Sequence, residues 1–169
     1  MDTDQIIRQL ENNRLVFQSQ LTGLEESVYQ FRPDHHSWTI LEILCHLVDE
    51  EREDFRTRVK NTLITPAKKP PSIDPEGWVK NRNYAQQVYA ERLETFLTER
   101  RASIKWLKSL EKPSWKNTYM HHTEGEMTAY GLLVNWLAHD YHHIRQINRR
   151  MYEYLQKKSG VRLGYAGNW

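Results

Sequence analysis

The stretch LAHDYHHIRQI, residues 137–147, lies late in a long segment whose apolar residues recur at helical spacing. A helix advances about 100° per residue, so His139 and His143 project from the same side and could bind one divalent ion. His142 points to a different side. Because the chain holds 8 histidines, such a pair also arises by chance. The motif therefore needs a third ligand from another segment.

The segment around this stretch is predicted to be the last of four long helices. Thr128 is its expected N-cap, and Gly160 is its expected C-terminal cap, following a helix that continues to about Lys158. Apolar residues on both sides of Asp140 place it on the buried stripe, beside the two histidines. We therefore expect Asp140 to accept a hydrogen bond from an imidazole N–H.

A complete start signal marks the second helix. Thr39 is the expected N-cap and Glu42 its capping-box partner, and the helix continues to about Val59. His46 lies at the edge of the apolar side of this helix, which makes it the candidate third ligand. Glu50 follows one turn later, where it is either a general base, a group that orients a ligand, or a solvated carboxylate.

Two further helices are predicted over residues 4–24 and 83–110, with no convincing alternating strand pattern anywhere. Residues 61–81 contain four of the 6 prolines and form a long connection between the second and third helices. Such a connection is either a lid or pocket wall, or simply a crossover between helices. The pattern indicates an all-α four-helix bundle that forms a single domain over residues 1–169.

Composition excludes several classes of partner. The net charge is +2 from 24 basic and 22 acidic residues, which are interspersed, so neither a nucleic-acid footprint nor a polybasic membrane patch is expected. No apolar run approaches the roughly 20 residues that span a bilayer. Cys45 is the single cysteine, which excludes an intramolecular disulfide and favours a cytoplasmic location. We expect Cys45 to be a small core residue.

Other residues have open roles. His121 and His122 precede the last helix and either line the mouth of the site or are ordinary surface residues. The tail aromatics Tyr165 and Trp169 are expected to dock on the domain or on a second subunit.

Two motifs carry a resemblance to a known family. The patterns WTxxExxxHLxDxE over residues 38–51 and HDxxHxxQI over residues 139–147 are similar to those of the DinB-like (DinB/YfiT-like) metalloenzymes. The resemblance covers nearly the whole chain. It implies an up-down-down-up four-helix bundle, usually a homodimer, that binds nickel, zinc or another divalent metal through His46, His139 and His143.

The resemblance also implies a class of reaction. Characterised relatives include S-transferases and isomerases that use a low-molecular-weight thiol, bacillithiol or mycothiol. We therefore expect a metal-dependent thiol S-transferase or hydrolase of a small-molecule substrate, with Glu50 and Asp140 as candidate catalytic residues. The alternative is a non-enzymatic metal-binding or stress-response bundle. A ferritin-like di-iron bundle would need Glu-x-x-His motifs, whereas Glu42 and His46 are four residues apart.

Overall fold

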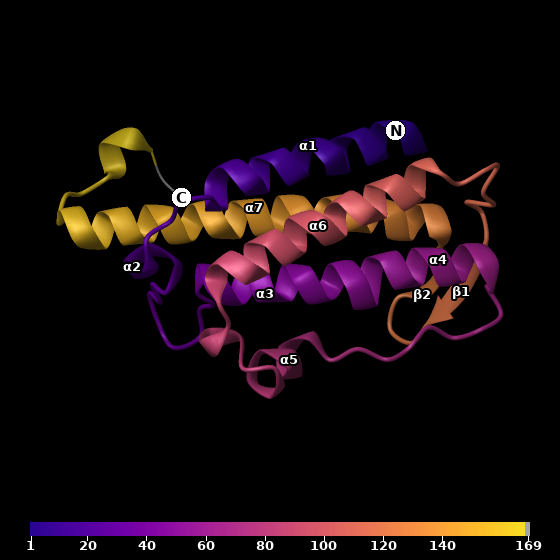
Figure 1. Ribbon diagram of the computed structural model, residues 1–169, viewed down its shortest axis with the longest axis horizontal. Helices are drawn as coiled ribbons and strands as arrows, with labels where there is room; N and C mark the ends of the chain where they lie inside the picture. Colours follow the sequence, from indigo (N-terminus) through magenta and orange to yellow (C-terminus); the bar gives the residue numbers. More distant parts are fainter. Residues whose placement is uncertain (168–169) are drawn as a thin grey trace.

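A computed structural model describes residues 1–167 of the chain. Figure 1 shows long helices lying side by side, with a small hairpin near one end. The long helical elements are α1 (Thr3–Leu21), α3 (Ile40–Asp49), α4 (Arg56–Ile64), α6 (Tyr89–Lys108) and α7 (Ala129–Ser159). The short elements are α2 (Glu26–Tyr29), the π-helical turn η1 (Glu50–Phe55), α5 (Pro75–Asn81), η2 (Tyr84–Gln86), β1 (Thr118–His121), β2 (Gly125–Thr128) and η3 (Gly164–Ala166).

Contacts between side chains fix the directions of the long helices. Asn13 of α1 hydrogen-bonds Asp140, and Gln20 hydrogen-bonds Asn148, so α1 and α7 run parallel. The hydroxyl of Tyr89, at the start of α6, donates to a carbonyl at the end of α1, so these two helices are antiparallel. The continuous segment α3-η1-α4 runs antiparallel to α7 (Figure 1).

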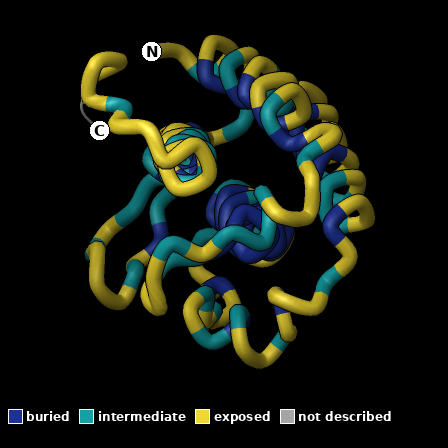
Figure 2. Tube along the Cα trace, turned by 90° about the vertical axis from the view of Figure 1, so that its left-hand side faces the viewer, coloured by how far each residue is buried: buried dark blue, intermediate teal, exposed yellow. Residues whose placement is uncertain are grey.

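The helix that carries His46 begins where the sequence predicts. Thr39 Oγ1 accepts from the backbone N–H of Glu42 at 3.2 Å, and the Glu42 carboxylate accepts from the backbone N–H of Thr39 at 2.8 Å. Every residue of α3 is buried, and it is the helix that is dark blue throughout in Figure 2. The capping box therefore fixes the entry of the most buried helix of the bundle.

The core has two apolar clusters, one toward each end of the bundle. One surrounds α3 and includes Phe17, Leu44 and Phe96. The other lies near the hairpin and includes Leu10, Val59 and Trp136. Cys45 is 2% exposed and belongs to the first cluster, as predicted.

The hairpin is a feature that the sequence prediction missed. β1 and β2 form a two-stranded antiparallel sheet, with Tyr119 opposite Met127 and His121 opposite Gly125. Gly125 adopts a φ of 73°, which a residue without a side chain reaches at little cost. Each strand has only four residues, too few for its alternation to stand out from loop composition.

Three predicted boundaries change. The second helix continues beyond Val59 to Ile64 and contains the π-helical turn η1, where a regular helix was expected. Part of the expected connection over 61–81 is the helix α5, so the irregular segment narrows to residues 65–74. Residues 83–88 precede α6 instead of opening it. The caps at Thr128 and Gly160 are confirmed.

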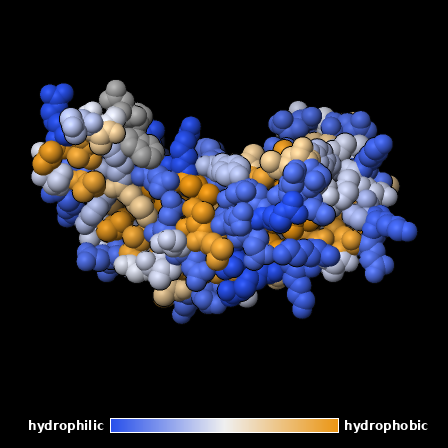
Figure 3. All heavy atoms as spheres, turned by 90° about the horizontal axis from the view of Figure 1, so that it is seen from above, coloured by the Kyte–Doolittle hydropathy of each residue, from blue (hydrophilic) through white to orange (hydrophobic). Residues whose placement is uncertain are grey.

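The surface is mainly hydrophilic. On the face seen from above, hydrophilic residues separate the apolar ones into several patches (Figure 3). None of the helices in residues 1–167 combines the length and apolar character needed to cross a bilayer. Tyr165 is fully exposed, so its predicted docking on the domain is wrong, and Trp169 lies outside the described residues.

Candidate metal centre

Three histidines from two antiparallel segments converge on one point. His139 Nε2 lies 3.2 Å from His46 Nε2 and 3.0 Å from His143 Nε2. One ligand atom from each residue can be chosen so that all lie within 4.8 Å of one another. His46 and His143 are 6% and 4% exposed. The structure thus brings together the three residues that the sequence named as metal ligands.

A hydrogen bond to the ring of His143 favours a free lone pair on its Nε2. Gln146 Oε1 lies 2.8 Å from His143 Nδ1, and because this amide oxygen only accepts, Nδ1 is the protonated ring nitrogen. Nε2 of His143 is therefore the unprotonated nitrogen, and it faces the other two rings. Gln146 fixes both the tautomer and the orientation of this histidine, as partners of metal-binding histidines commonly do.

The pKa values favour neutral rings. Burial, followed by the nearby histidines, lowers the pKa of His46 to about 3. Burial likewise lowers the pKa of His143 to about 4, and that of His139 falls well below its usual value. Neutral imidazoles are the form that binds a metal. The triad, meaning His46, His139 and His143, is therefore in its ligating form at neutral pH.

The spacing of the triad fits a divalent ion. Two nitrogens that each lie about 2.0–2.1 Å from an ion, at octahedral or tetrahedral angles, are about 2.8–3.4 Å apart. The two measured Nε2 separations, 3.2 and 3.0 Å, fall in that range. The donor set and its spacing thus suit an ion such as zinc or nickel.

A cavity of about 440 Å³ opens beside the triad. Besides the triad it is lined by His36, Ser37, Trp38, Pro75, Glu76, His142, Gln146 and Arg150. His142 lies outside the triad, in keeping with its predicted direction, and this exposed residue also lines the cavity. The open cavity gives a small molecule access to the histidines, which a closed structural site would not.

Two aromatic residues beside the triad were not predicted as part of it. The ring of Trp38 lies 5.0 Å from that of His46, and the ring of Phe55 lies 4.9 Å from that of His139. Phe55 also stacks on Trp136 at 5.9 Å. The spacing of Phe55, nine residues after His46, gave no signal because the π-helical turn between them changes which face it occupies.

Asp140 is buried as predicted, but its partner differs from the prediction. Its two carboxylate oxygens accept from the two terminal nitrogens of Arg100, each at 2.7 Å, and Asn13 donates to one of them at 3.2 Å. The guanidinium satisfies the carboxylate bidentately, so the acceptor beside the imidazoles is Gln146 instead. The prediction that Asp140 holds an imidazole is therefore wrong.

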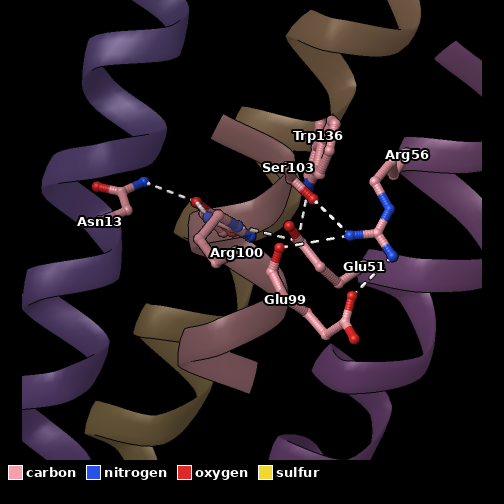
Figure 4. A network of polar contacts seen from close by, with 8 residues as sticks. Asn13, Glu51, Arg56, Glu99, Arg100, Ser103 and Trp136 are labelled. Carbon is pink, nitrogen blue, oxygen red and sulfur yellow. Dashed lines mark hydrogen bonds and ion pairs between the residues drawn. The ribbon is translucent and has the colours of Figure 1, made fainter. Parts of the chain in front are cut away.

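Arg100 continues the network behind the triad. Its Nε donates to the Glu51 carboxylate at 2.9 Å, which also accepts from the indole of Trp136 at 3.0 Å (Figure 4). The side chains of Arg100 and Asp140 are 1% and 0% exposed. After burial and the two neighbouring histidines, the charge of Arg100 is a further cause of the lowered pKa of His139.

Glu50 is buried, so the alternative in which it is a solvated carboxylate is wrong. It is 5% exposed and lies on η1, and its Oε1 has no hydrogen-bond partner within residues 1–167. Burial, followed by the neighbouring Asp54, raises the pKa of Glu50 to about 8. The side chain therefore holds a proton at neutral pH. Glu50 follows His46 by one helical turn, and it is not among the residues that line the triad cavity.

The two histidines that precede α7 lie elsewhere. His121 and His122 line a different cavity beside the hairpin, not the mouth of the triad cavity.

Burial raises the pKa of the Cys45 thiol to about 12, so this group is an inert core residue at neutral pH.

Comparison with known proteins gives two findings. A family model described as the DinB superfamily matches residues 9–147. The fold is similar to that of YfiT from Bacillus subtilis, with a TM-score of 0.79 and 17% sequence identity over 96% of this chain and 91% of that chain. YfiT is described as a probable metal-dependent hydrolase with an unusual four-helix bundle topology. No curated protein matches the sequence significantly.

Proposed function

The chain belongs to the DinB superfamily, and from that premise we propose that it is a metal-dependent hydrolase whose divalent ion is held by His46, His139 and His143. The observation that carries the proposal is the convergence of three neutral imidazoles, two of them buried and one half-buried, on the wall of an open cavity. Imidazole nitrogens suit zinc, nickel, copper and iron, and of these we propose zinc or nickel. The open cavity favours this reading over a purely structural metal site.

When bound, the ion would act as a Lewis acid that activates water and polarises a substrate carbonyl oxygen. The protein's own groups prepare the site. Gln146 orients His143, while Trp38 and Phe55 cover the outer sides of two rings and restrict water around them. Glu50 is the candidate proton donor, because its pKa of about 8 keeps it in the acid form. Since Glu50 does not line the triad cavity, its proton would reach the leaving group through an intervening water molecule.

Metal uptake and ester hydrolysis together test the proposal. We expect the natively purified protein to hold one zinc or nickel ion per chain, measured by elemental analysis, and to hydrolyse p-nitrophenyl acetate. Chelation should abolish hydrolysis, and the ion should restore it. A folded protein that takes up no stoichiometric divalent metal would contradict the proposal. Adding a low-molecular-weight thiol tests the finer expectation of S-transfer, in which the thiol sulfur attacks the ester carbonyl, p-nitrophenol leaves, and a thioester forms in place of free acetate.

Replacing Glu50 by Gln tests its role as proton donor. We expect unchanged metal content and a turnover of alkyl esters reduced by about 100-fold, as for loss of a general acid. The loss should be far smaller for p-nitrophenyl esters, whose leaving group needs no proton. Since the acid form is present below its pKa of about 8, wild-type turnover of alkyl esters should fall above pH 8, and this limb should vanish in Glu50→Gln.

The matched control is Glu53→Gln, which alters a carboxylate on the same turn. Its side chain is 44% exposed and pairs with Arg82 at the surface. Glu50 has no role in proton transfer if Glu50→Gln and Glu53→Gln reduce the turnover of alkyl esters equally. The same holds if Glu50→Gln reduces the turnover of alkyl and p-nitrophenyl esters equally.

Two finer properties are also inferred. From the helix directions described above we infer an up-down-down-up order of the four long helical segments. We further infer a homodimer, in keeping with the family resemblance, which sedimentation equilibrium can test.

A further inference from the structure

A second cavity, of about 660 Å³, lies between the hairpin, the irregular segment 65–74 and the helices α4 and α7. We call it the hairpin cavity. It is lined by Asp54, Phe55, Arg58, Lys69, Pro70, Pro71, Ser72, Ile73, Pro75, Tyr119, Met120, His121, His122, Glu124, Met127, Leu132 and Asn135. Its size is that of a site for a drug-sized group.

The hairpin cavity adjoins the metal centre. Phe55 forms part of its wall, and the same ring lies 4.9 Å from the ring of His139. Pro75 lines both cavities. On α7, Leu132, Asn135 and His139 follow at helical intervals of three and four and so share one face. Leu132 lies about 10 Å along the helix axis from His139, so an elongated molecule can reach both.

The lining of the hairpin cavity is mainly apolar. Its walls include Phe55, Ile73, Met127 and Leu132, together with a run of prolines. An apolar wall of this kind stabilises a bound apolar group by removing its surface from water.

The charges of the cavity cancel. The guanidinium of Arg58 is paired with the Asp54 carboxylate and donates to the hydroxyl of Tyr119 at 3.1 Å. Lys69 and Glu124, which are both exposed, supply one charge of each sign. An ionic ligand gains no net attraction from such a lining, whereas an uncharged group avoids the cost of desolvating a charge.

We propose that the hairpin cavity binds an uncharged apolar acyl or aryl group of an elongated substrate whose scissile bond lies at the triad. That the bound molecule is a substrate rests on the proposed hydrolase function. That the cavity binds an apolar group does not depend on it. The segment 65–74 is then a wall of the substrate site, which goes beyond its role as a connection between helices.

Binding is tested first, without metal. The probe is N-phenyl-1-naphthylamine, an uncharged aromatic dye whose fluorescence rises in apolar surroundings. We expect saturable binding of one dye per metal-free chain. Met120→Glu should weaken it by about tenfold or more, because it places a charge at an apolar wall. Met120 is 68% exposed, so the change spares the core, and Ile73→Glu gives a second, independent variant.

The matched control is Leu155→Glu, which places the same charge at a residue that is 54% exposed near the end of α7, outside the hairpin cavity. It should leave dye binding unchanged. The proposal is overturned if the wild type shows no saturable binding, or if Leu155→Glu weakens binding as much as Met120→Glu does.

Ester hydrolysis then tests whether the hairpin cavity and the triad act on the same substrate. The metal-loaded protein should show a higher kcat/KM for p-nitrophenyl octanoate than for the acetate, and Met120→Glu should remove this preference. A preference that survives Met120→Glu overturns the proposal. If the dye binds as expected but no ester is hydrolysed, the hydrolase function fails, while the cavity remains a site for an apolar ligand.

Discussion

Replacing Arg100 by methionine is expected to lower the free energy of unfolding by about 3–5 kcal/mol, because it leaves buried carboxylates without their cation. Arg100 donates to both oxygens of Asp140 and to Glu51, and all three side chains are at most 1% exposed. Urea unfolding of the metal-free protein at pH 7, followed by circular dichroism, measures the loss.

The neighbouring Arg101 provides the matched control. It pairs with Glu94 at the surface, where the two side chains are 49% and 72% exposed. Arg101→Met should change the free energy of unfolding by less than about 0.5 kcal/mol. Replacing Arg100 and Asp140 together by apolar residues should recover part of the loss, since no charge of that pair then remains. Similar losses for Arg100→Met and Arg101→Met would show that the buried network contributes little.

Replacing His139 by alanine is expected to weaken zinc binding by more than about 100-fold, since even partners of metal ligands contribute 10–100-fold. His139 Nε2 lies within 3.2 Å of both other Nε2 atoms, so its loss removes the central donor of the triad. Competition with a chelator of known affinity measures the change. Gln146→Leu should give a smaller loss, of about 10–100-fold, because it frees the ring of His143 without removing a ligand.

His142 supplies the control for His139. It lies on the same helix, is exposed and borders the same cavity, but it is not a member of the triad. His142→Ala should leave the affinity for zinc nearly unchanged. Equal affinities of the His139→Ala and His142→Ala proteins would exclude the triad as the metal site.

The parts of the fold that the sequence predicted are those with strong local signals. The capping box of Thr39 and Glu42, the N-cap Thr128 and the glycine after α7 are all confirmed. The three histidines were found by combining a one-turn spacing on one helix with a single histidine at the edge of another apolar face. The resemblance to the DinB-like family, which the match over residues 9–147 confirms, supported the choice.

The parts that were missed depend on contacts between distant segments. Asp140 could be placed inside the bundle, but its partner could not be identified from one helix alone. A usable signal existed, because Arg100 lies four residues from both Phe96 and Ile104 and so interrupts an apolar stripe with a charge. A buried cation on one helix and a buried acid on another predict a pair. The short strands of the hairpin gave no comparable signal.

The π-helical turn η1 sets the rotational phase between the two halves of the second long helix. In an uninterrupted α-helix, His46 and Arg58 would point about 120° apart, since 12 residues at about 100° each leave that remainder. The turn over residues 50–55 has the i→i+5 hydrogen-bond pattern and accommodates one extra residue, which takes up about 100° of rotation and so reduces the expected angle to about 20°. The triad and the hairpin cavity thus lie on the same side of this long helix because of the π-helical turn, and a one-residue deletion there would turn Arg58 away from that side.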